Sequence, residues 1–84
     1  MRHILVTGGF GFIGVSLLKS LARDADVLIH NVDNLSLGVT HFERLIPLDA
    51  RARIKNYVDD INNQDLVAAI VHDNNIRQVY HLAA

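Results

Sequence analysis

A glycine-rich stretch near the start of the chain reads Thr7-Gly8-Gly9-Phe10-Gly11-Phe12-Ile13-Gly14. It follows the apolar run Ile4-Leu5-Val6, which is typical of a strand that is buried on both faces. It leads into residues 12–23, where apolar side chains recur at helical spacing and polar side chains occupy the opposite side. This order predicts a strand, a tight turn and an amphipathic helix, which together form the first unit of an α/β fold.

The remainder of the chain continues the alternation of strands and helices. Further strands are expected at residues 27–32, 54–58 and 79–82. A helix is expected to begin at Asp65 and to end at the Asn74-Asn75 pair. The pattern between the second and third strands is less regular, and residues 41–45 are expected to form a short helix. Alternating strands and helices favour a parallel sheet with helices on both faces.

Length, charge and composition exclude several classes of protein. The 84 residues suffice for one domain at most. Eight Lys and Arg stand against nine Asp and Glu, and this balance argues against a nucleic-acid or membrane-surface partner. The absence of cysteine excludes disulfides, thiolate metal sites and a cysteine nucleophile. No apolar stretch approaches the ~18 residues of a membrane span and no signal-peptide pattern is present, so the cytoplasm is the expected compartment.

The spacing of the glycines fits a phosphate-binding turn in two registers, Gly9-x-Gly11-x-x-Gly14 and Gly8-x-x-Gly11-x-x-Gly14. One glycine permits a sharp turn out of the strand, and a second lets the backbone approach a pyrophosphate. The third lets the helix pack closely on the sheet. Phosphates bound there would face the free N–H groups and the positive end of the following helix.

An acidic residue, Asp33, stands nineteen residues after Gly14, at the end of the next predicted strand. A carboxylate at that place can accept hydrogen bonds from the ribose hydroxyls of an adenosine. The same charge would repel a 2′-phosphate, and no Arg or Lys stands in the next ten residues, so NAD is favoured over NADP. A phosphate-loop NTPase is excluded, because Val15-Ser16 stands where its Lys-Ser or Lys-Thr would be.

Four segments resemble the extended short-chain dehydrogenase/reductase family, and within it the NAD-dependent nucleotide-sugar epimerases and dehydratases. These segments are residues 7–14, 32–36, 60–61 and 81–84. The resemblance implies that the first holds the phosphates, that the second holds the adenosine ribose, and that Asp60 and Ile61 contact the adenine. It implies that small alanines at the fourth run beside the cofactor. The cofactor-binding residues expected from it are Gly8, Gly11, Phe12, Ile13, Gly14, Asp33, Asn34, Asp60, Ile61 and Ala83. For Phe12, packing of the loop is an equal alternative.

The resemblance also implies a Rossmann-like sheet with helices on both faces and four parallel strands in the order 3-2-1-4. Residues 1–84 would form the N-terminal part of its NAD(P)-binding domain. The family's catalytic Tyr-x-x-x-Lys pair is not found, because Ile61 follows Tyr57 at that spacing and Ala84 follows Tyr80. No catalytic residue is therefore assigned, and the catalytic half and the substrate domain are expected to be absent from the chain.

Two functions stay open. One is part of an NAD-dependent epimerase or dehydratase, which in the full-length family transfers hydride between a nucleotide sugar and bound NAD. A nucleotide sugar would then be a ligand only of a full-length form. The other is a non-catalytic NAD- or nucleotide-binding module, or a truncated inactive fragment. The sequence predicts the cofactor and leaves the choice between these functions open.

Two further expectations concern the edge of the sheet and the polar residues. The fourth strand would present an exposed apolar edge, with Val79, Tyr80 and Leu82, and self-association through it is expected. The five histidines have no metal-ligand spacing, so they are expected to be surface or strand-filling residues, and no metal site is expected. Asp59 departs from the family pattern, which often has glycine there, and adds a negative charge near the adenine.

Overall fold

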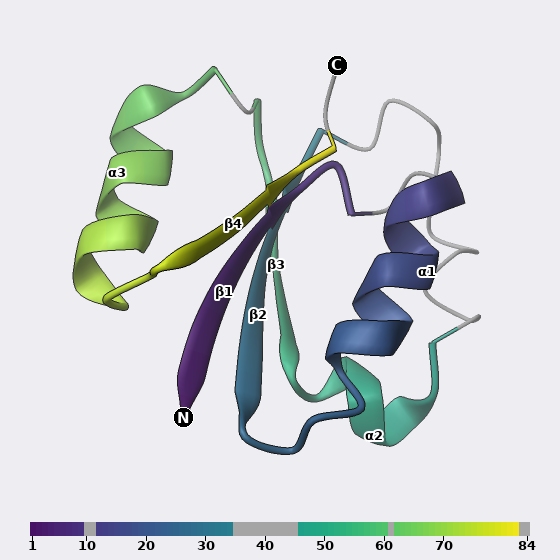
Figure 1. The fold of residues 1–84 in the computed structure, drawn as a ribbon. Helices are drawn as coiled ribbons and strands as arrows, with labels where there is room; N and C mark the ends of the chain where they lie inside the picture. Colours follow the sequence, from purple (N-terminus) through teal and green to yellow (C-terminus); the bar gives the residue numbers. More distant parts are fainter. Residues whose placement is uncertain (10–11, 35–45, 61, 83–84) are drawn as a thin grey trace.

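A computed structural model describes residues 1–9, 12–34, 46–60 and 62–82, with Phe12 described by its backbone alone. Strands and helices alternate along the chain, as Figure 1 shows. The elements are β1 (Arg2–Thr7), α1 (Phe12–Leu21), β2 (Val27–Asp33), α2 (Leu48–Arg51), β3 (Ile54–Val58), α3 (Gln64–Asp73) and β4 (Gln78–His81). The predicted strands and the two longer helices are therefore confirmed, with bounds that differ by a few residues.

The strands form one four-stranded sheet in the order β3-β2-β1-β4, and each neighbouring pair is parallel. This confirms the predicted topology. The register places Thr7 of β1 opposite Val32 of β2 and His81 of β4, while Asp33 lies opposite Val58 of β3. The carboxyl ends of the strands consequently meet at one edge of the sheet.

Helices cover the two faces of the sheet separately. The α1 side chains Val15 and Leu18 pack on the face that carries Ile4 and Val6, whereas α3 places Ile70 on the opposite face. Figure 1 shows α1 and α3 on either side of the sheet. Because β1 is covered on both faces, its apolar run is continuous rather than alternating, and its three central residues are at most 2% exposed.

Two polar residues define the ends of α3. The Asn63 side chain accepts a hydrogen bond from the Leu66 N–H at 3.2 Å and so caps the start of the helix. At the other end Asn75 adopts a φ of 51°, the left-handed conformation in which asparagine often terminates helices. The short α2 follows Pro47, whose carbonyl oxygen accepts the Arg51 N–H at 2.9 Å. The short helix expected at residues 41–45 lies outside the described residues.

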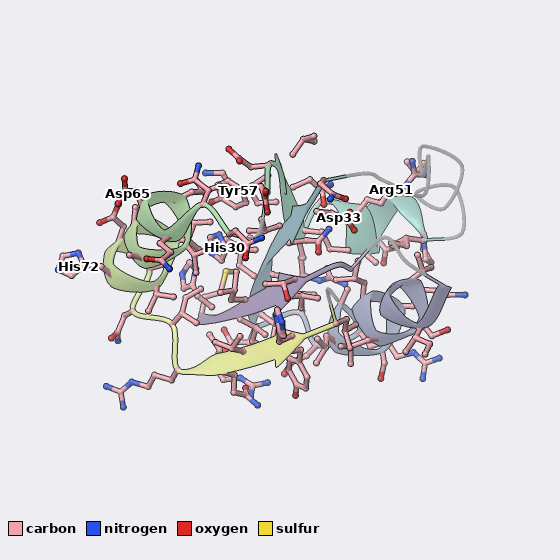
Figure 2. All side chains as sticks on the ribbon, turned by 90° about the horizontal axis from the view of Figure 1, so that it is seen from above. His30, Asp33, Arg51, Tyr57, Asp65 and His72 are labelled. Carbon is pink, nitrogen blue, oxygen red and sulfur yellow. The ribbon has the colours of Figure 1, made fainter. Side chains whose placement is uncertain are left out.

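A row of ring side chains crosses three strands on the face that carries α3. His30 of β2 is only 1% exposed, and its Nε2 lies 2.9 Å from His3 Nδ1 of β1. Its Nδ1 lies 3.0 Å from the Tyr57 hydroxyl of β3. Figure 2 shows His30 and Tyr57 on the side of the molecule where α3 lies. The description of His30 as a strand-filling residue was therefore incomplete, because both ring nitrogens take part in a partly buried hydrogen-bond network.

None of the described helices has the length and apolar character that crossing a membrane requires.

Candidate functional site

The carboxyl edge of the sheet brings together the segments that the sequence singled out. Thr7, Asp33, Val58 and His81 are the last residues of the four strands. Helix α1 also begins at this edge, as Figure 1 shows. In open α/β sheets, ligands bind outside the carboxyl ends of the strands, near the point where the order of strands reverses. The order reverses between β1 and β4, so β1 places the glycine turn beside this point, and Asp33 lies one strand away at the end of β2.

The glycine turn depends on glycine for two different reasons. Gly8 has a φ of 73°, a conformation that residues with a Cβ rarely adopt, and its N–H donates to the Val32 carbonyl oxygen at 2.8 Å. Gly14 lies in the first turn of α1, where a Cβ would come within 2.6 Å of the carbonyl oxygens of Gly8 and Gly9. The close approach of α1 to the turn therefore requires a glycine at this position.

Gly9 makes a third close contact, with the buried Asn31 of β2. The Gly9 N–H donates to Asn31 Oδ1 at 2.8 Å, and a Cβ on Gly9 would lie 2.2 Å from that same oxygen. Asn31 in turn donates through Nδ2 to Asn56 Oδ1 of β3 at 3.3 Å. Asn31 is not among the residues that the sequence motifs single out; the available signal is a polar residue within an otherwise apolar, buried strand.

Asp33 ends β2 at the same edge, two residues beyond Asn31. Its carbonyl oxygen accepts the Asp59 N–H at 3.1 Å, which places the turn after β3 directly beside the end of β2. The Asp33 side chain is partly exposed and Asn34 is exposed. Figure 2 shows Asp33 on the side of the molecule that carries α1 and α2. A carboxylate at this place can accept hydrogen bonds from a ligand at the strand ends.

Asp59 and Asp60 organise the turn that leads from β3 to α3. Asp59 Oδ1 accepts the Asp60 N–H at 2.7 Å, and Asp59 Oδ2 accepts from Asn63 Nδ2 at 3.3 Å. Asp60 Oδ1 accepts the Asn62 N–H at 2.8 Å, and its side chain is exposed. The Asp59 carboxylate, which departs from the family pattern, therefore has a local role in this turn.

Thr7 and His81 join the first segment to the last. Thr7 Oγ1 lies 2.7 Å from His81 Nδ1, and the Leu82 N–H donates to the Thr7 carbonyl oxygen at 2.9 Å. Thr7 is 1% exposed, whereas His81 is exposed.

Four of the expected cofactor residues lie wholly or partly outside the described part of the chain. Gly11, Ile61 and Ala83 lie outside the described residues, and so does the side chain of Phe12. Ile13, by contrast, is 73% exposed in the first turn of α1. In the described part of the chain, no group of three His, Cys, Asp or Glu side chains is placed to hold a metal ion.

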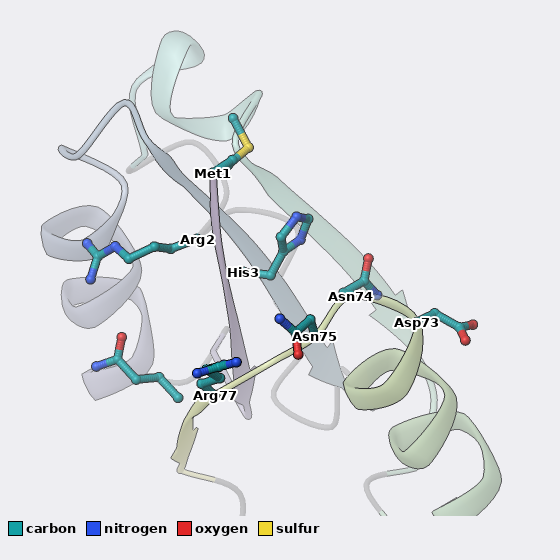
Figure 3. Close-up of a pocket in the computed structure, with 8 residues that line it drawn as sticks. Met1, Arg2, His3, Asp73, Asn74, Asn75 and Arg77 are labelled. Atoms are coloured by element: carbon teal, nitrogen blue, oxygen red, sulfur yellow. The ribbon is translucent and has the colours of Figure 1, made fainter.

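A depression lies at the other end of the sheet, where β1 and β4 begin. This open depression of about 510 Å³ lies between the start of β1 and the end of α3, as Figure 3 shows. Arg2 and Arg77 are among its lining residues, and the Arg2 guanidinium donates to Asp24 Oδ2 at 2.8 Å. None of the residues singled out for cofactor binding lines this depression.

The parallel sheet in the order 3-2-1-4, the glycine turn and the acidic strand end define an α/β protein of the Rossmann class. A family model described as GDP-mannose 4,6 dehydratase matches residues 5–84. The chain belongs to this family, which confirms the resemblance to nucleotide-sugar epimerases and dehydratases.

Individual relatives agree with this assignment. The UDP-glucose 4-epimerase of Neisseria meningitidis serogroup A is 34% identical over 85 residues, which correspond to 99% of this chain and 24% of that protein. The UDP-glucuronic acid 4-epimerase from Bacillus cereus, solved with UDP-glucuronic acid and NAD, is 32% identical, with a TM-score of 0.80. That match covers 99% of this chain and 26% of the epimerase.

A more distant relative supports the fold. The dTDP-glucose 4,6-dehydratase from Bacillus anthracis, solved with NAD, is 22% identical and has a TM-score of 0.84. That match covers 100% of this chain and 27% of the dehydratase. The chain thus spans about a quarter of the length of the relatives that it matches.

Proposed function

We propose that this chain binds NAD at the carboxyl edge of its sheet, with the adenosine diphosphate half of the cofactor beside the glycine turn. The observation that carries the proposal is the turn itself. Gly8 adopts a left-handed conformation and Gly14 leaves no room for a Cβ, so the close approach of α1 to the turn depends on glycine at both positions. Membership of the family, and the NAD held by the Bacillus cereus epimerase, support the choice of cofactor.

Different residues at this edge would contact different parts of the cofactor. The N–H groups at the start of α1 would face the phosphates, and Asp33 would accept the ribose hydroxyls. Asp33 would also disfavour the 2′-phosphate of NADP. The exposed Ile13 side chain is available for an apolar contact, and Asp60 is exposed at the turn nearest Asp33. Contacts of the cofactor with Gly11, Phe12, Asn34, Ile61 and Ala83 stay predictions.

A part for this chain in the activity of its longer relatives is a further proposal. NAD supplies the hydride acceptor in such an enzyme, and the 84 residues contain no Tyr-x-x-x-Lys pair to move the sugar proton. We propose that the chain corresponds to the N-terminal part of an NAD(P)-binding domain. Action on a nucleotide sugar would then belong to a longer polypeptide that supplies this pair. The same site would also serve a non-catalytic NAD-binding module, which would bind NAD without reducing it.

The exposed edge of β4 suggests a partner for the chain. Val79 is 56% exposed and Leu82 is 40% exposed, and β4 is the last strand in the order of the sheet. We propose that β4 pairs with a strand of a second copy. Sedimentation at about tens of micromolar would give a species larger than a monomer, whereas a stable monomer would contradict this proposal. A cytoplasmic location also stays a prediction.

Asp33 offers the sharpest test of the binding site. Calorimetric titration of NAD should show a weaker affinity for Asp33→Asn, by about tenfold, because the neutral amide accepts hydrogen bonds from ribose hydroxyls less strongly. Asp73→Asn is the matched control, since Asp73 ends α3 near the opposite edge of the sheet and is exposed. Equal affinities for NAD in the two variants would show that Asp33 is not part of the site.

A further inference from the structure

Asn31 is an unusual residue for its position. Its side chain is 0% exposed, and it lies in β2 on the same face of the sheet as the buried apolar residue Ile29. A buried amide group loses its hydration, and this loss is offset only if its hydrogen bonds are made within the protein. Asn31 makes two such bonds, one on either side: to Gly9 in the glycine turn and to Asn56 in β3.

The direction of these two bonds fixes the orientation of the amide. The Gly9 backbone N–H is a donor, so the Asn31 oxygen must face it, and the distance is 2.8 Å. The Asn31 nitrogen therefore faces Asn56, whose Oδ1 accepts at 3.3 Å. A leucine or valine at position 31 would match the apolar character of the buried neighbours on this face. It would leave the buried Gly9 N–H without this acceptor.

The contact also needs a glycine opposite Asn31. A Cβ on Gly9 would lie 2.2 Å from the Asn31 oxygen and 2.7 Å from its Cγ. Gly9 is confined from the other direction as well, because its carbonyl oxygen lies 2.6 Å from the place that a Cβ on Gly14 would take. The backbone of Gly9 is thus held between strand β2 and helix α1. Its N–H is directed into the core, towards Asn31, rather than towards a ligand.

We propose that Asn31 is a positioning residue for the glycine turn: by holding the Gly9 N–H it fixes the first part of the turn, at Gly8 and Gly9, in the position needed for binding of the pyrophosphate. This inference rests on the proposed binding of NAD and adds to it a residue that touches no part of the cofactor. Asn31 precedes Asp33 by two residues on β2. One strand therefore positions both the turn for the phosphates and the carboxylate for the ribose.

The test separates positioning from stability. Asn31→Leu and Asn31→Ala remove the acceptor, while Ile29→Val shortens a buried apolar side chain of the same strand that has no polar group to hold the turn. Each variant is compared with the unchanged chain by urea unfolding, by calorimetric titration of NAD, and by hydrogen exchange of the Gly9 amide in nuclear magnetic resonance spectra. Asn56→Ala is a second control, because it keeps the acceptor for Gly9.

Both Asn31 variants should bind NAD about tenfold more weakly or worse, and their Gly9 amide should exchange at least about tenfold faster. Ile29→Val should lose stability but keep its affinity and its Gly9 protection, and Asn56→Ala should keep Gly9 protection within about twofold. Unchanged affinity or unchanged Gly9 exchange in folded Asn31→Ala would overturn the inference. If the unchanged chain fails to bind NAD, the proposed function is wrong, and Gly9 exchange alone then decides whether Asn31 holds the turn.

Discussion

Thr7 Oγ1 lies 2.7 Å from His81 Nδ1, so a side-chain hydrogen bond joins the carboxyl ends of β1 and β4. The two residues are also paired in the register of the strands. This contact places the glycine turn, which begins directly after Thr7, at a fixed position relative to the end of β4. The edge of the sheet is therefore held together by side chains as well as by the backbone ladder.

The Thr7–His81 bond should contribute measurably to stability. Thr7→Val keeps the shape of the side chain and removes the hydroxyl, and it should lower the free energy of unfolding by about 1 kcal/mol. Urea unfolding of Thr7→Val, His81→Ala and the double variant measures the coupling between the two residues. Strictly additive losses would mean that the bond contributes nothing to the folded state.

Burial of His30 makes the stability of the folded chain depend on pH. Burial, followed by the nearby positive charges of His3 and Lys55, lowers the pKa of His30 from 6.5 to about 4. Between these two pKa values the unfolded chain binds a proton at this site that the folded chain does not, so unfolding is favoured as the pH falls. Stability is therefore fully present above about pH 6.5 and decreases down to about pH 4, by up to about 3 kcal/mol.

Urea midpoints measured from pH 7.5 to pH 4 test this dependence, with His72→Gln as the control. His72 is exposed, so its replacement should leave the slope of stability against pH almost unchanged. His30→Gln removes the titrating ring and should flatten the slope. A slope that survives in His30→Gln would assign the pH dependence to other groups.

Even the smallest replacement of Gly14, by alanine, should destabilise the folded chain. Alanine favours helices over glycine by about 1 kcal/mol, but its Cβ would lie 2.6 Å from two backbone oxygens. Because backbone atoms must then move, Gly14→Ala should lower the free energy of unfolding by about 1–3 kcal/mol. Ser20→Ala, at an exposed position of α1, should be neutral or slightly stabilising in the same urea experiment. A neutral Gly14→Ala would show that α1 can withdraw from the turn without loss.

The cap of α3 can be tested with two adjacent asparagines. Asn63 accepts the Leu66 N–H, so Asn63→Ala should cost about 1 kcal/mol of stability. Asn62 uses its backbone N–H rather than its side chain in the contact with Asp60, so Asn62→Ala should cost much less. Thermal unfolding of the two variants compares these costs, and equal losses would contradict the assignment of Asn63 as the cap.

Much of this fold could be predicted from the sequence, because its elements have clear local patterns. The continuous apolar run at Ile4-Leu5-Val6 predicts a buried strand, and the spacing of Leu66, Val67 and Ile70 predicts a helix. The order of the strands came from the resemblance to a family, since local periodicity does not specify which strands are neighbours. The helical turn at residues 48–51 lies in the irregular stretch between the second and third strands, where a helical turn is expected, but four residues carry too little periodicity to predict its position.

The polar interior could not be predicted in the same way. His30 and Asn31 are adjacent in one strand and point to opposite faces, and their partners lie in β1, β3 and the glycine turn. These contacts depend on the register between strands that are about 25 residues apart in sequence. The contacts of Asn31 follow only from the pairing of β2 with its neighbours.

Binding of NAD at the glycine turn is the proposal on which the function of this chain depends. The most direct measurement is a calorimetric titration of NAD and NADP into the folded chain and into Gly8→Val. A β-branched residue is disfavoured at the φ of 73° that Gly8 adopts. We expect one saturable site for NAD, weaker binding of NADP, and loss of NAD binding in Gly8→Val. No saturable binding of NAD by the folded chain, or undiminished binding by folded Gly8→Val, would contradict the claim.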